Sequence, residues 1–152
     1  MIDLLPDKYG YRDYWIFTLQ MSGWRYARDL NIPYYDITAK SGNKLFAPDW
    51  DNLMAYKRGE MNNEEYSRRY YEKVVPTMRT HTEEWDKLAE SKTFAFACYC
   101  KAGEFCHRYL FAMLYVDYLK SHGAVVEFKG ELKPHPDNLQ FYTRRVEQEQ
   151  SG

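Results

Sequence analysis

The fold of this chain is decided by residues 93–128, which begin with the almost wholly apolar run TFAFACY at positions 93–99. A continuous run of this kind is typical of a central strand that is covered on both faces. Residues 105–122 follow after a short loop and predict a helix, which Gly123 ends in the left-handed conformation. Because residues 124–128 predict another strand, the stretch is a β-loop-α-β unit, whose two strands we expect to be parallel.

The residues before this unit continue the alternation of strands and helices. Further strands are predicted at residues 14–19 and 34–38, because both are rich in β-branched and aromatic side chains. Apolar periodicity and helix-ending prolines and glycines predict helices over residues 24–30, 49–59, 62–76 and 76–89. We therefore expect a single α/β domain over residues 1–152, with a three-layer, Rossmann-like arrangement of helices around a mostly parallel sheet. Residues 143–152 are expected to form a flexible tail.

The composition argues against several classes of protein. Of 152 residues, 21 are Lys or Arg and 22 are Asp or Glu, so no global positive charge favours non-specific binding of nucleic acid. No apolar run approaches the roughly 20 residues that a membrane-spanning helix needs, and the N-terminus does not begin a secretory signal. The cysteine count of three is odd, so the cysteines cannot all pair within the chain. We expect a cytoplasmic protein with reduced thiols and an oligomeric state that the sequence does not determine.

The densest group of reactive side chains is the run CYCKAGEFCHR at positions 98–108. The period of a strand puts Cys98 and Cys100 on the same side of the chain. Cys106, His107 and Arg108 are expected in the first turn of the following helix, where free N–H groups and the helix dipole favour an anion. The sequence therefore predicts an anion-binding site at this strand end.

Other cations are expected to converge on the same crevice, because ligands of open α/β sheets bind at the carboxyl ends of the strands. Lys40, Ser41 and Lys44 follow the second predicted strand, and Arg25 follows the first. We expect Lys40 and Arg108 to hold the anion, with the other residues as further ligand contacts.

This pocket suggests a protein that binds an anionic small molecule, most simply a nucleotide or nucleoside derivative. Tyr66 could stack on a base, and Cys106 is a further ligand-contact candidate. His107 is the candidate general acid or base of a hydrolytic or transfer reaction, and the thiols of Cys98 and Cys100 are further catalytic candidates. A non-catalytic nucleotide-binding or interaction module is the alternative.

The cysteines allow two other interpretations. Cys100 before a loop and helix is similar to the thiolate of rhodaneses and cysteine phosphatases, although Arg108 stands two positions later than the phosphatase spacing requires. The run also contains four residues of the types that bind zinc, namely Cys98, Cys100, Cys106 and His107. Their spacing differs from that of paired C-x2-C sites, and two adjacent residues rarely reach one ion, so we predict no metal and no cofactor. The cysteines could also be small packing residues.

The same residues occur in a fixed order along the chain. The order is Lys40-Ser41-Gly42, Phe46-Ala47-Pro48, Trp50, Tyr66, Tyr70, Trp85, Cys98-Tyr99-Cys100, Phe105-Cys106-His107-Arg108 and Gly130-Glu131. Over residues 14–131, the chain resembles a family of small bacterial and phage proteins called domain of unknown function 488. The hallmark of that family is a strand ending in Cys, a short loop, and Cys-His-Arg at the start of a helix.

The resemblance implies that Cys98, Cys106, His107 and Arg108 form the motif of the family. The better-known branch carries an acidic residue at the position of Cys100, which argues against Cys100 as a nucleophile. Family members encoded by phages imply, by analogy only, a role near nucleotides, DNA modification or host defence.

Overall fold

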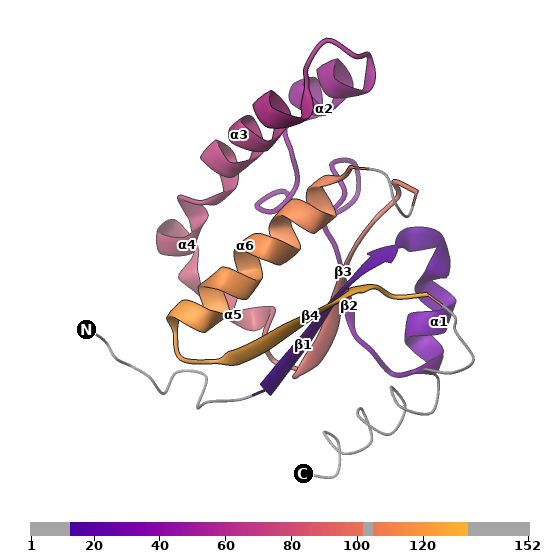
Figure 1. The fold of residues 1–152 in the computed structure, drawn as a ribbon, viewed down its shortest axis with the longest axis vertical. Coiled ribbons are helices and arrows are strands. Elements are labelled where there is room, and N and C mark those ends of the chain that lie inside the picture. The colour runs from indigo at the N-terminus through magenta and orange to yellow at the C-terminus, as the bar shows by residue number, and fades with distance from the viewer. Residues whose placement is uncertain (1–12, 102–104, 134–152) are drawn as a thin grey trace.

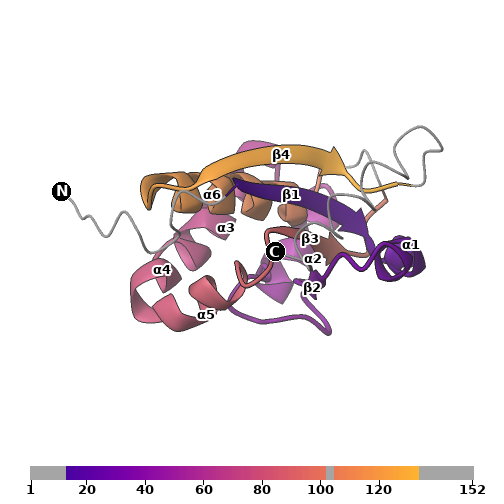
Figure 2. The same cartoon turned by 90° about the horizontal axis from the view of Figure 1, so that it is seen from below.

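The computed structural model describes residues 13–101 and 105–133, and their strands form one parallel sheet (Figure 1). The strands are β1 (Asp13–Gln20), β2 (Tyr34–Asp36), β3 (Thr93–Cys98) and β4 (Val125–Glu131). Their order is β2-β3-β1-β4, and every neighbouring pair is parallel (Figure 2). The expected α/β class with a parallel sheet is confirmed, and β3 is central and fully buried, as its apolar sequence predicted. The tail expected at residues 143–152 lies outside the described residues.

Helices lie on both faces of the sheet, as a three-layer arrangement requires. They are α1 (Trp24–Asp29), α2 (Trp50–Lys57), α3 (Asn63–Val74), α4 (Thr77–Thr80), α5 (Thr82–Lys87) and α6 (His107–Ser121), and the 3-10 turn η2 (Met21–Gly23) precedes α1. Ala27 and Leu30, on α1 and at its end, are buried against one face. Residues from α3, α5 and α6 are buried against the other face.

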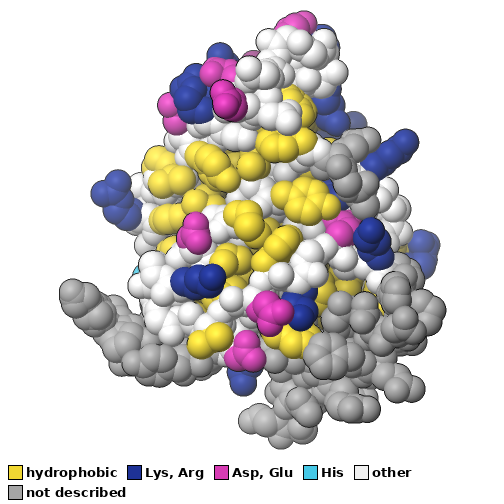
Figure 3. Space-filling view, in the orientation of Figure 1, with side chains coloured by type: hydrophobic (Ala, Val, Ile, Leu, Met, Phe, Trp, Pro, Cys, Tyr) yellow, Lys and Arg dark blue, Asp and Glu magenta, His cyan; other side chains and the backbone are white. Residues whose placement is uncertain are grey.

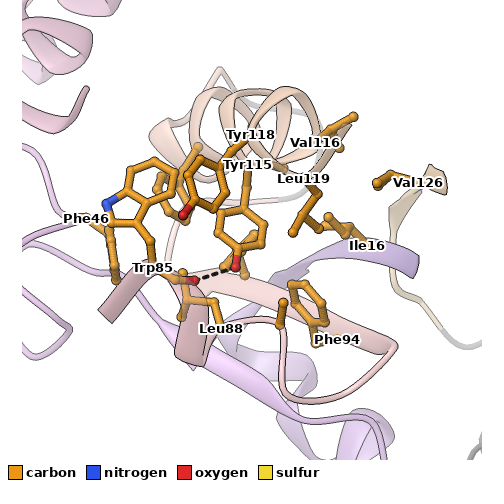
Figure 4. Packing of buried hydrophobic residues seen from close by; sticks show 14 of the residues in the cluster. Ile16, Phe46, Trp85, Leu88, Phe94, Tyr115, Val116, Tyr118, Leu119 and Val126 are labelled. Atoms are coloured by element: carbon orange, nitrogen blue, oxygen red, sulfur yellow. Dashed lines mark hydrogen bonds between the residues drawn. The ribbon is translucent and has the colours of Figure 1, made fainter. Parts of the chain in front are cut away.

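The alternation of side chains along β1 supplies both cores. Tyr14 and Ile16 belong to the core under α6, whereas Trp15 and Phe17 belong to the core on the α1 side. The α6 core is rich in aromatic rings, and Figure 4 shows Tyr115 of α6 donating a hydrogen bond to the carbonyl oxygen of Trp85. Aromatic residues make up 18 % of the chain, and many of them are core residues, where ring pairs add to the free energy of burial.

The single helix predicted over residues 76–89 is wrong, because the chain forms α4 and α5 with a break at His81. His81 has φ −135° and ψ 48°, which are not helical. Threonine hydroxyls around the break bond to backbone carbonyls: Thr80 Oγ1 donates to Pro76 O at 3.3 Å and Thr82 Oγ1 donates to Met78 O at 2.8 Å. Such bonds compete with helical hydrogen bonds, and they explain why apolar periodicity alone did not predict the break.

A bulge in β4 changes which side chains face α6. Ile16 of β1 pairs with Phe128, but Phe17 pairs with Gly130, so Lys129 is skipped. Gly130 has φ +86°, a conformation that glycine adopts without steric cost. Because the extra residue reverses the alternation, Glu131 points to the α6 side, whereas Leu132 joins the core on the α1 side.

The face formed by α6 and β4 is apolar at its middle. Figure 3 shows hydrophobic side chains gathered there, with charged side chains between and around them. In the described part of the chain, no helix combines the length and apolar character needed to cross a membrane.

Candidate functional site

The end of β3 and the start of α6 bring three cysteine sulfurs together. Cys98 is the last residue of β3, Cys100 lies in the loop, and Cys106 occupies the N-cap position of α6 with an extended φ of −153°. The three Sγ atoms lie within 4.8 Å of one another, and 2.7 Å separates those of Cys98 and Cys106. Helix α6 begins at His107, so Cys106 lies just before the first turn in which it was expected. We call Cys98, Cys100 and Cys106 the cysteine cluster; residues 102–104 of the loop lie outside the described residues.

The three thiols of the cluster differ in their pKa. Cys106 and then Cys98 donate hydrogen bonds to the sulfur of Cys100, which lowers the pKa of Cys100 far below its ordinary value. The same contacts raise the pKa of Cys106, because its thiol is the donor and because its sulfur is buried. Cys100 is therefore the thiol of the cluster that loses its proton most readily.

Arg108 lies behind the cluster and is fully buried. Its Nη1 donates to Cys98 Sγ and to the backbone oxygen of Cys100, both at 2.9 Å. Its Nε donates to Glu131 Oε1 at 3.2 Å, and Glu131 also accepts hydrogen bonds from Thr18 Oγ1 and Gln20 N, each at 2.6 Å. The guanidinium is thus held inside the protein by Glu131 and the cysteine loop. This position differs from the expected one, in which Arg108 faces a bound anion, because the carboxylate of Glu131 already neutralises it.

His107 is buried and neutral. Its Nε2 donates to the carbonyl oxygen of Ile37 at 2.6 Å, and its Nδ1 lies 3.7 Å from Cys106 Sγ. Burial lowers the pKa of His107 to about 4, so Nδ1 carries no proton near pH 7. The imidazole could therefore accept a proton on the side that faces the cluster.

Two adjoining cavities open beside the cysteine cluster. The larger has a volume of about 520 Å³ and is lined by Leu53, Tyr56, Lys57, Gly59, Met61, Tyr66, Cys100, Phe105 and Cys106. The smaller has a volume of about 210 Å³ and is lined by Thr38, Ala39, Lys40, Trp50, Leu53, Met54, Lys57, Cys98, Tyr99, Cys100 and His107. Leu53, Lys57 and Cys100 border both, so the two cavities meet at Cys100.

The lining of these cavities combines aromatic rings with positive charge. Tyr56 and Tyr66 stack with their ring centroids 4.5 Å apart, and Phe105 lies 5.9 Å from Tyr56. Lys57 borders both cavities and Lys40 borders the smaller one, so two cations stand against the acidic thiol of Cys100, and no Asp or Glu is among the lining residues that the structure describes. The site therefore favours a negatively charged ligand with an apolar or aromatic part.

Of the three ligand contacts predicted in the loop after β2, only Lys40 lines a cavity. Lys40 lines the smaller cavity, whereas Ser41 donates to Asp36 Oδ2 at 2.8 Å and so holds the loop. The ammonium of Lys44 donates to the carbonyl oxygens of Ala39 and Lys40, which makes it an internal support of this loop.

Arg25 does not line either cavity. It lies exposed on α1, with its guanidinium 4.6 Å above the ring of Trp24, and α1 packs on the opposite face of the sheet from α6. The expectation that Arg25 joins the crevice is therefore wrong, because the first βα connection leads away from the α6 side.

Sequence reasoning missed several residues of the site, among them Tyr56, Lys57, Phe105 and Glu131. Tyr56 and Lys57 lie in the last turn of α2, and their place depends on how α2 packs against α3. Phe105 entered only as the first residue of the predicted helix and as part of the resemblance. Glu131, the partner of Arg108, entered only as part of the Gly130-Glu131 pair in the resemblance. Gly130 was the sequence signal that could have indicated a bulge in this strand.

Comparison with known proteins agrees with the motif. Residues 23–119 match the family DUF488-N3a, described as the active DUF488-N3 subclade. No curated protein and no solved structure shows significant similarity to the chain. The match covers well over half of the chain, including the whole cysteine cluster and Arg108. The chain therefore belongs to the DUF488-N3a family.

Proposed function

We propose that the two cavities bind an anionic small molecule with an aromatic part, most simply a nucleotide or nucleoside derivative. The observation that supports this most is their lining, in which Lys57 and Lys40 stand beside aromatic rings without a carboxylate among the described lining residues. The larger cavity, at about 520 Å³, has the size of an ordinary small-molecule site.

The proposed ligand makes two kinds of contact. Its planar ring packs against Tyr56 and Phe105, since stacking of a base on an aromatic side chain contributes roughly 1–3 kcal/mol. Its anionic group reaches Lys57, which borders both cavities, and Lys40 is the second cation on the side of the smaller cavity. A hydrogen bond to a charged group contributes about 1.5–3 kcal/mol, so Lys57 carries much of the preference for anions.

The proposal includes a hydrolytic or transfer reaction on the bound molecule. His107 borders the smaller cavity, and its Nδ1 carries no proton near pH 7 and is available to accept one. The description of the family as active supports turnover rather than storage of the ligand.

A second candidate function is group transfer through the thiolate of Cys100. Cys100 is the half-buried member of the cluster, and it borders both cavities, so a bound ligand would meet its sulfur. In this function, Cys100 attacks the ligand and its leaving group departs, and a second acceptor then releases the transferred group from sulfur.

The proposed function is tested by equilibrium binding of adenosine 5′-monophosphate (AMP), adenosine and inorganic phosphate to the full chain. We expect AMP to bind more tightly than either fragment. Lys57→Met should weaken AMP binding by about tenfold or more, which corresponds to at least about 1.4 kcal/mol, and should leave adenosine binding nearly unchanged.

Lys120→Met is the matched control, because Lys120 is an exposed lysine near the end of α6 and lines neither cavity. Equal effects of the two lysine substitutions, or no preference for AMP over adenosine, would reject an anionic ligand in these cavities. Recovery of AMP chemically intact after long incubation would instead favour the non-catalytic binding module.

A further inference from the structure

The cysteine cluster has the geometry of a metal site. Its three Sγ atoms come from the end of β3, the following loop and the residue before α6, and they lie within 4.8 Å of one another. The Sγ atoms of Cys98 and Cys106 lie 2.7 Å apart. Tetrahedral zinc with Zn–S bonds of about 2.3 Å holds its sulfurs roughly 3.8 Å apart, a value between these two distances. Small movements of the side chains therefore suffice to place all three sulfurs around one ion.

We propose that Cys98, Cys100 and Cys106 bind one zinc ion through their Sγ atoms, with a fourth coordination position that faces the ligand cavities. Soft thiolates favour zinc over hard cations such as magnesium and calcium. Binding exchanges the remaining thiol protons for the metal and releases them to solvent, so it needs neither an oxidant nor a reductant.

Arg108 supports one ligand of such a site. One zinc ion and three thiolates together carry a net charge of −1, and a hydrogen bond from a guanidinium to a thiolate sulfur stabilises that charge. The Nη1 of Arg108 lies 2.9 Å from Cys98 Sγ, and the pairing with Glu131 keeps the guanidinium in that position. Groups that hydrogen-bond to metal ligands in this way orient the ligands and tune the metal.

In the part of the chain that the structure describes, no residue takes the fourth position, which lies on the cavity side. Cys98 borders the smaller cavity, Cys106 borders the larger one and Cys100 borders both. Two adjacent residues rarely reach one ion, so His107, whose Nδ1 lies 3.7 Å from Cys106 Sγ, remains beside the site and not among its ligands. Three protein ligands and an open position are typical of catalytic zinc, whereas structural sites have four protein ligands.

A zinc ion at this place would polarise an oxygen of water or of the bound molecule. The choice of an anionic molecule rests on the proposed function, but the metal site itself does not. The metal can therefore be tested alone, with no ligand present.

The test is metal binding by the full, untagged chain kept under reducing conditions. Native mass spectrometry and elemental analysis of protein from zinc-supplemented cells should give one zinc per chain. After the metal is removed, titration with Zn²⁺ against a coloured chelator should show binding that Cys100→Ala weakens by more than the roughly 100-fold seen when a supporting residue is lost. Val125→Ala is the control: Val125 is 57 % exposed on β4, lines neither cavity, and should be replaceable without loss of affinity.

Cobalt(II) provides a second readout that does not depend on the stability of the alanine variant. Wild-type protein should show thiolate-to-cobalt charge-transfer absorption, which should be weaker in Cys100→Asp because a carboxylate replaces one thiolate. Wild-type protein that contains no zinc, shows no such absorption and binds Zn²⁺ no better than Cys100→Ala would overturn the proposal. Rapid alkylation of Cys100 in freshly purified protein would also overturn it, in favour of thiol transfer.

The outcomes for metal and ligand are separable. Zinc binding without AMP binding upholds the metal site and rejects the proposed ligand. AMP binding to protein that takes up no zinc upholds the ligand and rejects the metal.

Discussion

Arg108 and Glu131 form the most deeply buried ion pair among the residues that the structure describes, with side-chain exposures of 0 % and 7 %. Removing one partner of such a pair leaves the other charge buried without compensation. We expect Arg108→Ala to lower the free energy of unfolding by about 3–5 kcal/mol, measured by urea denaturation at neutral pH.

The control for this prediction is Arg28→Ala, which breaks the pair of Arg28 with Asp29. That pair is more than half exposed, so its loss should cost about 0–1 kcal/mol. Equal losses for the two variants would show that the Arg108 pair is hydrated in solution, contrary to the structure.

Asp36 is the residue for which the structure predicts a pH dependence. Burial alone would raise the pKa of Asp36, but hydrogen bonds from Thr38 and Ser41 outweigh burial and lower it below 3.8. A carboxyl group with a lowered pKa stabilises the fold above its unfolded value, and this contribution is lost as the pH falls through the folded value. The stability difference between wild type and Asp36→Asn should therefore be largest near pH 7 and shrink below pH 3.8. Urea unfolding across this range measures it, and a difference that does not change with pH would contradict the account.

At the scale of the elements, the bulge in β4 links backbone conformation to the ion pair. Gly130→Ala should cost about 1–2 kcal/mol, because Gly130 has φ +86° and an L-residue is strained there. Since the bulge also aims Glu131 at Arg108, the effect should couple to Glu131→Gln with an interaction energy of about 0.5–3 kcal/mol in a double-mutant cycle.

Gly123→Ala gives the matched cycle. Gly123 has a similar φ of +91° but lies at the end of α6, away from the bulge. Its effect should add to that of Glu131→Gln within about 0.5 kcal/mol. Coupling of the same size in both cycles would mean that the bulge does not position Glu131.

Helices and strands could be predicted where the local sequence carries a strong signal. They could not be predicted where contacts with distant residues determine the local structure. Strand β3 was predictable because an apolar run has few other solutions, and the start of α3 because Asn62 accepts a hydrogen bond from Glu65 N at 2.8 Å. Asp49 does occupy the N-cap position of α2, but its carboxylate lies 3.4 Å from Lys73 Nζ instead of capping the helix. Such tertiary pairings leave no trace in the local sequence.

In the candidate site, too, the local features were predictable and the contacts between distant residues were not. The convergence of Cys98, Cys100 and Cys106 was foreseeable, because one loop joins a strand end to a helix start. Burial of Arg108 was not, because its partner Glu131 is 23 positions away and reaches it only through the bulge. Lys57 depends on the packing of α2 against α3, which no motif encodes.

At the scale of the whole molecule, the order of the strands determines which backbone amides are exposed to solvent only on global unfolding. β3 lies between β2 and β1, is buried along its whole length, and has its backbone hydrogen bonds inside the protein. Amide hydrogens of Phe94 to Ala97 should exchange slowest, with opening free energies near that of global unfolding, whereas those of edge strand β2 should exchange faster. Hydrogen exchange followed by mass spectrometry measures this, and faster exchange in β3 than in β2 would contradict the topology.

The central claim is that α2, the loop after β3 and the start of α6 together form one site for an anionic ligand. Two-dimensional NMR of uniformly ¹⁵N-labelled protein, titrated with AMP, tests this claim most directly. The account predicts saturable shifts of the backbone amides of Tyr56, Lys57, Cys100 and Phe105, and none on α1 around Arg25. Saturable shifts confined to α1, or no shifts at all with any of the three probes, would contradict it.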